Sequence, residues 1–412
     1  MVAVHSAAVS GPETREVAEA LCTELGRSAG RPDLMPDFLF VFYGCDHDSS
    51  ELHRMLAERF PETALLGGTS CAGVMTDARL WDPATVGALA ICDPEGDYGV
   101  AAASLGEDPA GTAETTLHRA LAAAGCPGEV PELIWIFQAP GREEDVIEGL
   151  RRVVGDSCLI IGGSAADNTV EGNWMQIGPE GPMADRLIVG VLFTSGGVGF
   201  SFQGGYEPAG PQGVVTRVGF SKGGDSGIAT KTSGREILEI DGEPAAATYN
   251  RWIGGTISDK VDGGGNILAD TTMCPLAVDA GKIGGIPHYL LIHPDSVLSN
   301  GALTTFATIQ EGAKIYSMRG DRGRLVERAG RVASDAAARL PGGPDSLAGG
   351  LIVYCAGCML AVGEDMPQVA DIVRGSFGGA PFLGCFTFGE QGALVDRNVH
   401  GNLMISAIAF GR

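Results

Sequence analysis

The clearest chemical pattern in the sequence is a pair of cysteines, Cys355 and Cys358, directly after the apolar segment 351–354. Two thiols at this spacing can form a redox pair or contribute to a metal site. The aromatic residue and proline of a thioredoxin motif are missing, and a four-thiolate zinc site would need a second such pair, which the sequence lacks. We therefore interpret both cysteines as small, polarisable residues that line a pocket, with a redox or metal role as the alternative.

A second cluster of reactive residue types runs from Cys45 to Asp48. Its thiol, the imidazole of His47 and the carboxylates could act as a nucleophile with its base. Adjacent side chains on an extended loop point apart, however, and an acidic residue followed by serines is typical of a helix N-terminus. We favour the second interpretation, in which Asp48 or Ser49 caps a helix that begins near Ser50.

Small polar and thiol side chains also follow three glycine turns, which read GGTSCAG at 67–73, GGSAADN at 162–168 and GCFTFGEQG at 384–392. Glycine permits tight turns and close backbone approach. Glu390 and Asp167 are the best candidates for anchoring a ligand amine; alternatively, each satisfies backbone N–H groups of its own loop. The candidate ligand-binding residues are Gly68, Thr69, Ser70, Cys71, Gly163, Ser164, Asp167, Asn168, Cys355, Cys358, Cys385, Thr387 and Glu390.

The elements that position these turns form a pattern that occurs three times, at 38–73, 133–168 and 351–392. Each copy has an apolar strand, a helical segment and a second apolar strand that ends on the turn. The last residue of the first strand and the first glycine of the turn are 25, 25 and 30 residues apart. This recurrence indicates duplication of a β-α-β unit with parallel strands. Because ligands bind beyond the carboxyl ends of such strands, we expect the three turns to meet in one cleft.

Further strands are expected around these units. Segments 86–92 and 98–105 are predicted to form a hairpin, and 173–177 and 187–193 a similar antiparallel pair. A glycine-rich region between Gly196 and Gly234 marks a change in composition, and a boundary placed there gives two halves, 1–215 and 216–412. The predicted fold is α/β, with repeated β-α-β units in mixed sheets flanked by helices and a cleft between two related halves.

The composition excludes several classes of function. The 412 residues carry a formal net charge of −23 without a basic patch, which argues against nucleic-acid and anionic-membrane partners. No apolar stretch is long enough for a transmembrane helix. The first residues lack the features of a signal peptide, and the ten cysteines are scattered. We therefore expect a cytoplasmic protein with free thiols.

The order of these segments resembles the FIST family of sensory domains, named for F-box and intracellular signal transduction proteins. The segments that carry the resemblance are the three glycine turns, ILEIDGEPAAATYNRWIG at 237–254 and YCAGCML at 354–360. They cover nearly the whole chain as an N-terminal and a C-terminal FIST half. Cys358 departs from the pattern, because a basic or polar residue is expected there.

The resemblance implies a small-molecule sensor, with amino-acid-like ligands and a histidine kinase or another signalling protein as its partner. The sequence contains no kinase, cyclase or methyl-accepting segment, so we expect the output to pass through a separate protein. Haem is a cofactor that the resemblance also implies, because some bacterial members look like nitric oxide sensors. None of the seven histidines, His400 included, lies in a haem signature.

Three functions therefore stay open. The first is a sensor without its own catalysis. The second is an enzyme with Cys71, Cys355 or Cys385 as nucleophile and Glu390 or Asp167 as acid–base. The third is a haem-based nitric oxide sensor. Turnover of the ligand separates the first two, and colour identifies the third.

Overall fold

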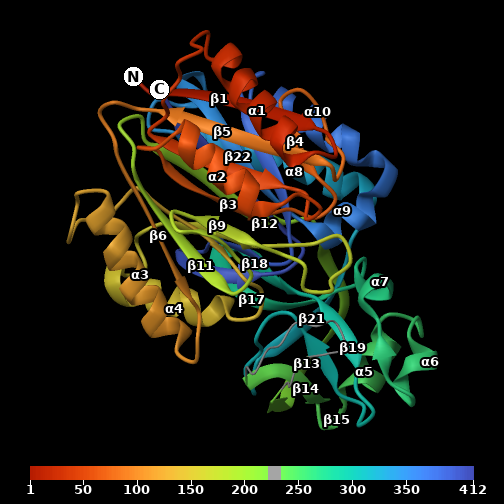
Figure 1. The fold of residues 1–412 in the computed structure, drawn as a ribbon. Coiled ribbons are helices and arrows are strands. Elements are labelled where there is room, and N and C mark those ends of the chain that lie inside the picture. The colour runs from red at the N-terminus through yellow and green to blue at the C-terminus, as the bar shows by residue number, and fades with distance from the viewer. Residues whose placement is uncertain (221–232) are drawn as a thin grey trace.

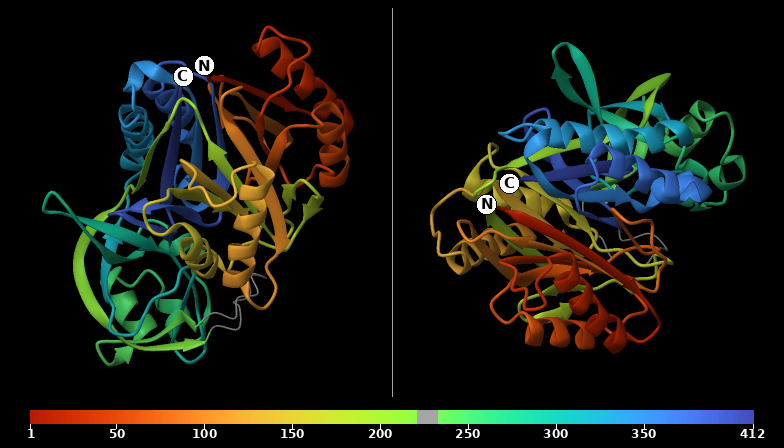
Figure 2. Two further views of the ribbon diagram at one scale, coloured as in Figure 1. Left: turned by 90° about the vertical axis from the view of Figure 1, so that its left-hand side faces the viewer. Right: turned by 90° about the horizontal axis from the view of Figure 1, so that it is seen from above.

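The computed structural model describes residues 1–220 and 233–412 of the chain. Three mixed sheets share one design, and a fourth sheet is inserted in the chain before the third repeat (Figure 1). The α/β class, with repeated β-α-β units in mixed sheets flanked by helices, is confirmed. The two termini lie side by side at one end of the molecule in all views (Figure 1 and Figure 2).

Each related sheet is built around two parallel strands of one repeat. The first sheet has the order β1 (Ala3–Ser10), β5 (Thr85–Cys92), β2 (Phe38–Tyr43), β3 (Ala64–Thr69), β9 (Gln176–Gly178) and β10 (Gly181–Met183). The second has the order β6 (Asp97–Ser104), β11 (Arg186–Phe193), β7 (Leu133–Gln138), β8 (Ile160–Ser164), β24 (Glu390–Leu394) and β25 (Arg397–Gly401). The third has the order β12 (Val198–Gly204), β26 (Met404–Gly411), β22 (Leu347–Cys355), β23 (Phe382–Thr387) and β4 (Val74–Thr76).

Helices cover the outer face of each sheet, as the view from above shows (Figure 2). They are α1 (Thr14–Ser28) and α2 (Ser49–Arg59) on the first sheet, α3 (Pro109–Ala123) and α4 (Glu143–Val154) on the second, and α8 (Arg322–Ala338), α9 (Ala356–Val362) and α10 (Met366–Ser376) on the third. Two short 3-10 helices lie in the same part of the chain, Pro344–Ser346 before β22 and Gly363–Asp365 after α9. Among the described residues, none of the helices combines the length and apolar character needed to cross a membrane.

The three sheets are interlocked by strands that leave their own repeat. After the first glycine turn, β4 pairs with β23 of the third sheet. After the second, β9 pairs with β3 of the first sheet, and after the third, β24 pairs with β8 of the second. This exchange runs once around the three sheets, so the backbone of each repeat is hydrogen-bonded to both others.

The observed strand pairing shows that the two hairpin predictions were wrong. Strand β5 lies between β1 and β2, whereas β6, which follows it after a short turn, pairs with β11 in the second sheet. Likewise β9 and β11 belong to different sheets. The turn between β5 and β6 is short enough for a hairpin, but it carries the chain from one sheet to the next. Tertiary pairing therefore overrides the local signal.

The inner faces of the three sheets meet in one apolar core. Along β2, Phe40 and Phe42 face inward, and their ring centroids lie 5.1 and 6.2 Å from that of Trp135 in the second sheet. The alternate residues Leu39 and Val41 face outward and pack beneath α1 and α2. Because both faces are buried, the strands read as continuous apolar runs.

The inserted region, residues 207–319, has its own core and extends from one end of the molecule (Figure 1 and Figure 2). Its strands are β13 (Glu207–Phe220), β14 (Ser233–Ile240), β15 (Glu243–Pro244), β16 (Gly265–Asn266), β17 (Leu276–Ile283), β18 (Ile286–Ile292), β19 (Pro294–Val297), β20 (Leu303–Thr305) and β21 (Lys314–Arg319). Its helices are α5 (Ala245–Trp252), α6 (Ser258–Val261) and α7 (Leu268–Thr271). The proposed boundary between halves 1–215 and 216–412 falls within β13 and stays a prediction.

Candidate functional site

The three glycine turns lie together at one edge of the three sheets. The backbone N–H of Cys71 donates to the carbonyl of Phe386 at 3.1 Å, and that of Ala166 donates to Thr69 at 3.1 Å. The N–H of Phe388 donates to Ser164, also at 3.1 Å. Each turn is thus hydrogen-bonded to the other two. The sequence placed them after parallel strands, and the exchanged strands bring them into contact.

A cavity of about 640 Å³ opens beside this ring of turns. One side consists of the first two turns, and another is α9 with Met359 and Leu360. The inserted region closes the third side with α7 and Phe306. Five of the residues predicted from the sequence line it, namely Cys71, Asp167, Asn168, Cys355 and Thr387. The lining is mainly apolar with a few polar groups, as is common in small-molecule sites.

The other predicted residues support the turns without lining this cavity. Ser70 Oγ donates to the carbonyl of Gly73 at 2.6 Å and accepts from the N–H of Phe386 at 2.8 Å. Thr69 Oγ1 accepts from the N–H of Met175 at 3.0 Å. The buried residues Gly68, Gly163, Ser164 and Cys385 lie within the sheets, and Cys358 is a buried residue of α9.

Gly68 shows why glycine is required in one of these turns. Its φ is 159°, and an added Cβ would lie 2.3 Å from the carbonyl oxygen of Met175. The side chain of Phe137 would be 2.6 Å away. Any larger residue would therefore push the exchanged strand β9 away from β3.

Glu390 is fully enclosed at the third turn. Its carboxyl group accepts from Thr387 Oγ1 at 2.8 Å and from the N–H of Met404 at 3.1 Å. Burial, with a smaller effect from Cys355, raises the pKa of this carboxyl well above its ordinary value. A neutral carboxylic acid that serves its own loop matches the second interpretation given for Glu390 above.

Asp167 organises the loop that borders the cavity at the second turn. Its Oδ1 accepts from the N–H groups of Thr169, at 3.0 Å, and Val170, and its Oδ2 from those of Glu171, Gly172 and Asn173, at 3.1, 2.9 and 2.7 Å. The loop holds Val170, which lines the cavity, at a φ of 61°, a conformation that β-branched residues rarely adopt.

Asn168, the next residue, ties two turns together. Its Oδ1 accepts from the N–H of Ala72 at 2.7 Å, so the first and second turns are joined through this side chain as well. Asn168 and Ala72 both line the cavity.

Comparison with known proteins identifies the family. The FIST N domain matches residues 37–243 and the FIST C domain matches residues 245–393. The chain belongs to the FIST family. FIST domains are sensory domains of signal transduction, and the cavity is bordered by residues of both matched regions.

Among solved structures, the chain is similar to the cyanuric acid hydrolase from A. caulinodans, with 9% identity, a TM-score of 0.35 and full coverage of both chains. A second cyanuric acid hydrolase gives 8% identity, a TM-score of 0.35 and full coverage of both. PurLQS from Thermotoga maritima gives 8% identity and a TM-score of 0.21 over 76% of this chain and 72% of that chain. No curated protein sequence matches this FIST protein significantly.

The FIST C region supplies cavity residues that the sequence analysis missed, His293 and Arg322 among them. His293 is buried, its Nε2 lies 3.1 Å from the carbonyl of Leu268, and burial lowers the pKa of the ring to about 4. A neutral imidazole that donates from Nε2 leaves Nδ1 as an acceptor. Arg322 is the first residue of α8. The residue before it, Asp321, is the N-cap, and its side chain accepts from the backbone N–H of Arg324 at 3.1 Å. No local signal shows that this helix end faces a cavity.

Arg322 is the only arginine or lysine among the described residues of the lining. It is exposed at the start of α8, and no carboxylate of the described residues forms an ion pair with it. In a chain of net charge −23, a cation at a cavity that has no partner in the described part of the chain is a ready site for an anionic group.

The thiols near the cavity are protonated at neutral pH. Burial raises the pKa of Cys71 to about 12, and it raises that of Cys355 well above its ordinary value. The pKa of Cys385, in the central core, is also raised, chiefly by burial. Since the thiolate is the nucleophile, this environment works against cysteine catalysis.

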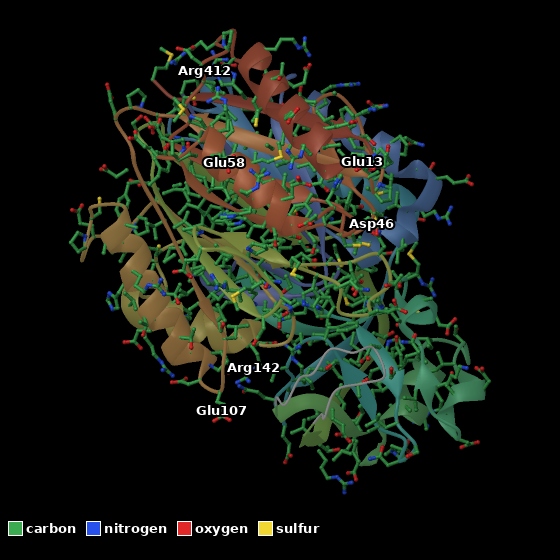
Figure 3. All side chains as sticks on the ribbon, viewed as in Figure 1. Glu13, Asp46, Glu58, Glu107, Arg142 and Arg412 are labelled. Atoms are coloured by element: carbon green, nitrogen blue, oxygen red, sulfur yellow. The ribbon has the colours of Figure 1, made fainter. Side chains whose placement is uncertain are left out.

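A separate buried cluster joins the second repeat to the inserted region. Arg235 of β14 donates from Nη2 to Glu143 at 2.8 Å and to Glu144 at 2.6 Å. His400 Nδ1 lies 3.1 Å from Glu144, and the N–H of Thr308 donates to the same carboxylate at 2.8 Å. Arg142, which Figure 3 labels, lies immediately before α4 at this end of the second repeat. We call Glu143, Glu144, Arg235 and His400 the charge cluster.

The charge cluster has the donor types of a metal site, because one ligand atom each of Glu143, Glu144 and His400 lies within 4.8 Å of the others. Arg235 already balances both carboxylates, however. Burial alone would raise the pKa of Glu144, but Arg235 and His400 outweigh it and hold this pKa well below its ordinary value. The cluster is therefore explained as an ion-pair network that holds the inserted region in place.

Proposed function

We propose that this FIST protein is a cytoplasmic sensor that binds a small molecule in the cavity and signals through a separate protein, such as a histidine kinase. The observation that carries the proposal is the cavity of about 640 Å³ between residues of the two FIST regions. A ligand that touches the turns, α9 and the inserted region at once would change how these parts are held together. Such a differential contact is what couples binding to a conformational output.

The lining indicates the type of ligand. Met359, Leu360, Phe306 and Phe388 suit an apolar body, and Arg322 suits an anionic group at its end. An apolar carboxylate, including an amino acid with an apolar side chain, matches both features. Glu390 is enclosed, and the Asp167 carboxylate already accepts from five backbone N–H groups, which leaves a ligand amine to Asn168 or solvent.

Ligand identification is the first test. Native mass spectrometry of purified protein should reveal a bound small molecule that leaves unchanged on denaturation. Calorimetry should then show that apolar carboxylates bind at least ten times more tightly than the amides or alcohols of the same shape, because a charged hydrogen bond contributes about 1.5–3 kcal/mol. Equal affinity for the neutral isosteres would contradict a role of Arg322.

Enzymatic turnover is the competing function. The raised thiol pKa values and the enclosed Glu390 argue against it, and conversion of the identified ligand by the protein alone would overturn the sensor proposal.

Haem fits the cavity residues poorly. His293, the one histidine of the lining, uses Nε2 for its contact with Leu268, and the cavity thiols are held in the protonated form. An absorption spectrum of freshly purified protein tests this directly, since bound haem gives an intense Soret band.

A further inference from the structure

The cysteine pair at the start of α9 has no role in the proposed sensor. Cys355 is the N-cap residue of this helix, and Cys358 is the third residue within it. In regular helices the side chain of an N-cap residue lies near the backbone N–H groups of the second and third positions, and Cys355 forms no capping hydrogen bond with them. Both the N–H and the thiol of Cys358 are close enough to Cys355 Sγ to act on its pKa.

The two thiols differ in what they can reach. Cys355 lines the cavity, whereas Cys358 is fully buried and its sulfur lies 3.7 Å from the hydroxyl of Tyr206. Cys355 Sγ also accepts from the N–H of Leu403 at 3.3 Å, which fixes its position. A molecule in the cavity can therefore meet Cys355 first, with Cys358 directly behind it.

Gly357, between them, is required by the close approach of Leu403. An added Cβ at this residue would lie 2.7 Å from Leu403 Cδ2, 3.6 Å from Cys355 Sγ and 3.7 Å from His293 Nδ1. The absence of a side chain thus lets Leu403 pack closely against this turn, beside the sulfur and the imidazole. The three residues Cys355, Gly357 and His293 all belong to the cavity lining.

We propose that Cys355 and Cys358 form a thiol–disulfide exchange site that reacts with low-molecular-weight disulfides entering the cavity. Deprotonated Cys355 attacks one sulfur of the disulfide, forms a mixed disulfide and releases the first thiol, which takes up the proton that Cys355 lost. Cys358 then attacks the Cys355 sulfur, and the second thiol leaves with the proton of Cys358. The incoming disulfide gains two electrons and two protons, and the protein gains one disulfide.

The surroundings set the rate of this reaction. Because the Cys355 thiol is held protonated by burial, exchange should be slow at neutral pH and about ten times faster for each unit of pH increase. A ligand in the cavity would cover Cys355 and slow the exchange, and this last expectation alone rests on the proposed function.

The experiment uses the full chain, reduced and then incubated with oxidised glutathione. Samples are quenched with acid, alkylated and mapped by mass spectrometry. The expected product is the peptide in which Cys355 and Cys358 are joined by a disulfide. Its mass is lower than that of the reduced peptide by two hydrogen atoms. Cys358→Ser should accumulate glutathione on Cys355, and Cys355→Ser should leave Cys358 unmodified.

Two controls keep the test decisive. Cys385→Ser removes a buried thiol that does not line the cavity and should leave the exchange unchanged. Wherever circular dichroism shows that a Cys→Ser variant has lost its fold, the Cys→Ala variant replaces it. Glutathione confined to partly exposed thiols such as Cys22 and Cys45, with the Cys355–Cys358 peptide still reduced, would overturn the proposal. Because no ligand is added in this arm, its outcome is independent of the sensor function.

Discussion

The charge cluster and the cavity differ in how their polar groups are satisfied. In the charge cluster, Arg235 is almost fully buried and is held by two carboxylates. At the cavity, Arg322 is exposed and has no ion-pair partner among the described residues. A buried cation must be paired to be tolerated, whereas an exposed cation stays solvated until a ligand arrives. We infer that the first arginine supports the fold and that the second serves binding.

The largest effect is expected from Arg235→Met. This change leaves the buried Glu143 without its arginine partner, and removing one member of a buried ion pair typically costs about 3–5 kcal/mol. Urea unfolding should show this loss in the free energy of unfolding. A loss below 1 kcal/mol would show that the charge cluster does not hold the inserted region.

Arg322→Met should act on binding and leave stability unchanged. We expect about 10–100-fold weaker binding of an apolar carboxylate in calorimetry, because one charge-assisted hydrogen bond is lost. The matched control is Arg324→Met on the same helix, an exposed arginine that pairs with Glu207. If both variants bind alike, the unpaired state of Arg322 has no functional meaning.

Two glutamates, the half-buried Glu144 and the fully buried Glu390, extend the comparison to pH. The pKa of Glu144 is lowered, so its contribution to stability is present above the unfolded-state pKa and is lost as the pH falls through the folded-state pKa. The pKa of Glu390 is raised by burial, so its contribution is complete below the unfolded-state pKa and is lost as the pH rises through the folded-state pKa.

Glu390→Gln removes this second dependence. Relative to the wild type, the variant should gain about 1.4 kcal/mol in free energy of unfolding between about pH 5 and pH 6, measured by urea unfolding at each pH. A difference that is constant with pH would mean that Glu390 is ionised in the folded protein.

The smallest effect is expected from Arg217→Met in the inserted region. Arg217 pairs with Glu239 at 3.0 Å, but its side chain is 59% exposed. An exposed ion pair contributes about 0–1 kcal/mol, so the midpoint of urea unfolding should hardly move. A loss as large as that of Arg235→Met would show that burial is not what separates the two pairs.

The local elements and the repeat could be predicted from the sequence. The helix expected near Ser50 begins at Ser49, and Asp48 caps it by accepting from the N–H groups of Ser50 and Glu51 at 2.9 and 3.0 Å. The β-α-β units, their parallel strands and the turns that end them were also predicted. These features depend on apolar periodicity and capping groups within a few residues of one another, which a sequence displays directly.

Strand pairing and the lining of the cavity depend on how distant segments of the chain meet. The backbone N–H and C=O groups of one strand edge resemble those of any other, so the sequence could not show that β4, β9 and β24 join neighbouring sheets. His293 reaches the cavity because the inserted region folds back against the turns, and Arg322 reaches it because α8 begins beside that region. Folding also encloses Glu390 and keeps it neutral, since protonation depends on the surroundings that folding creates.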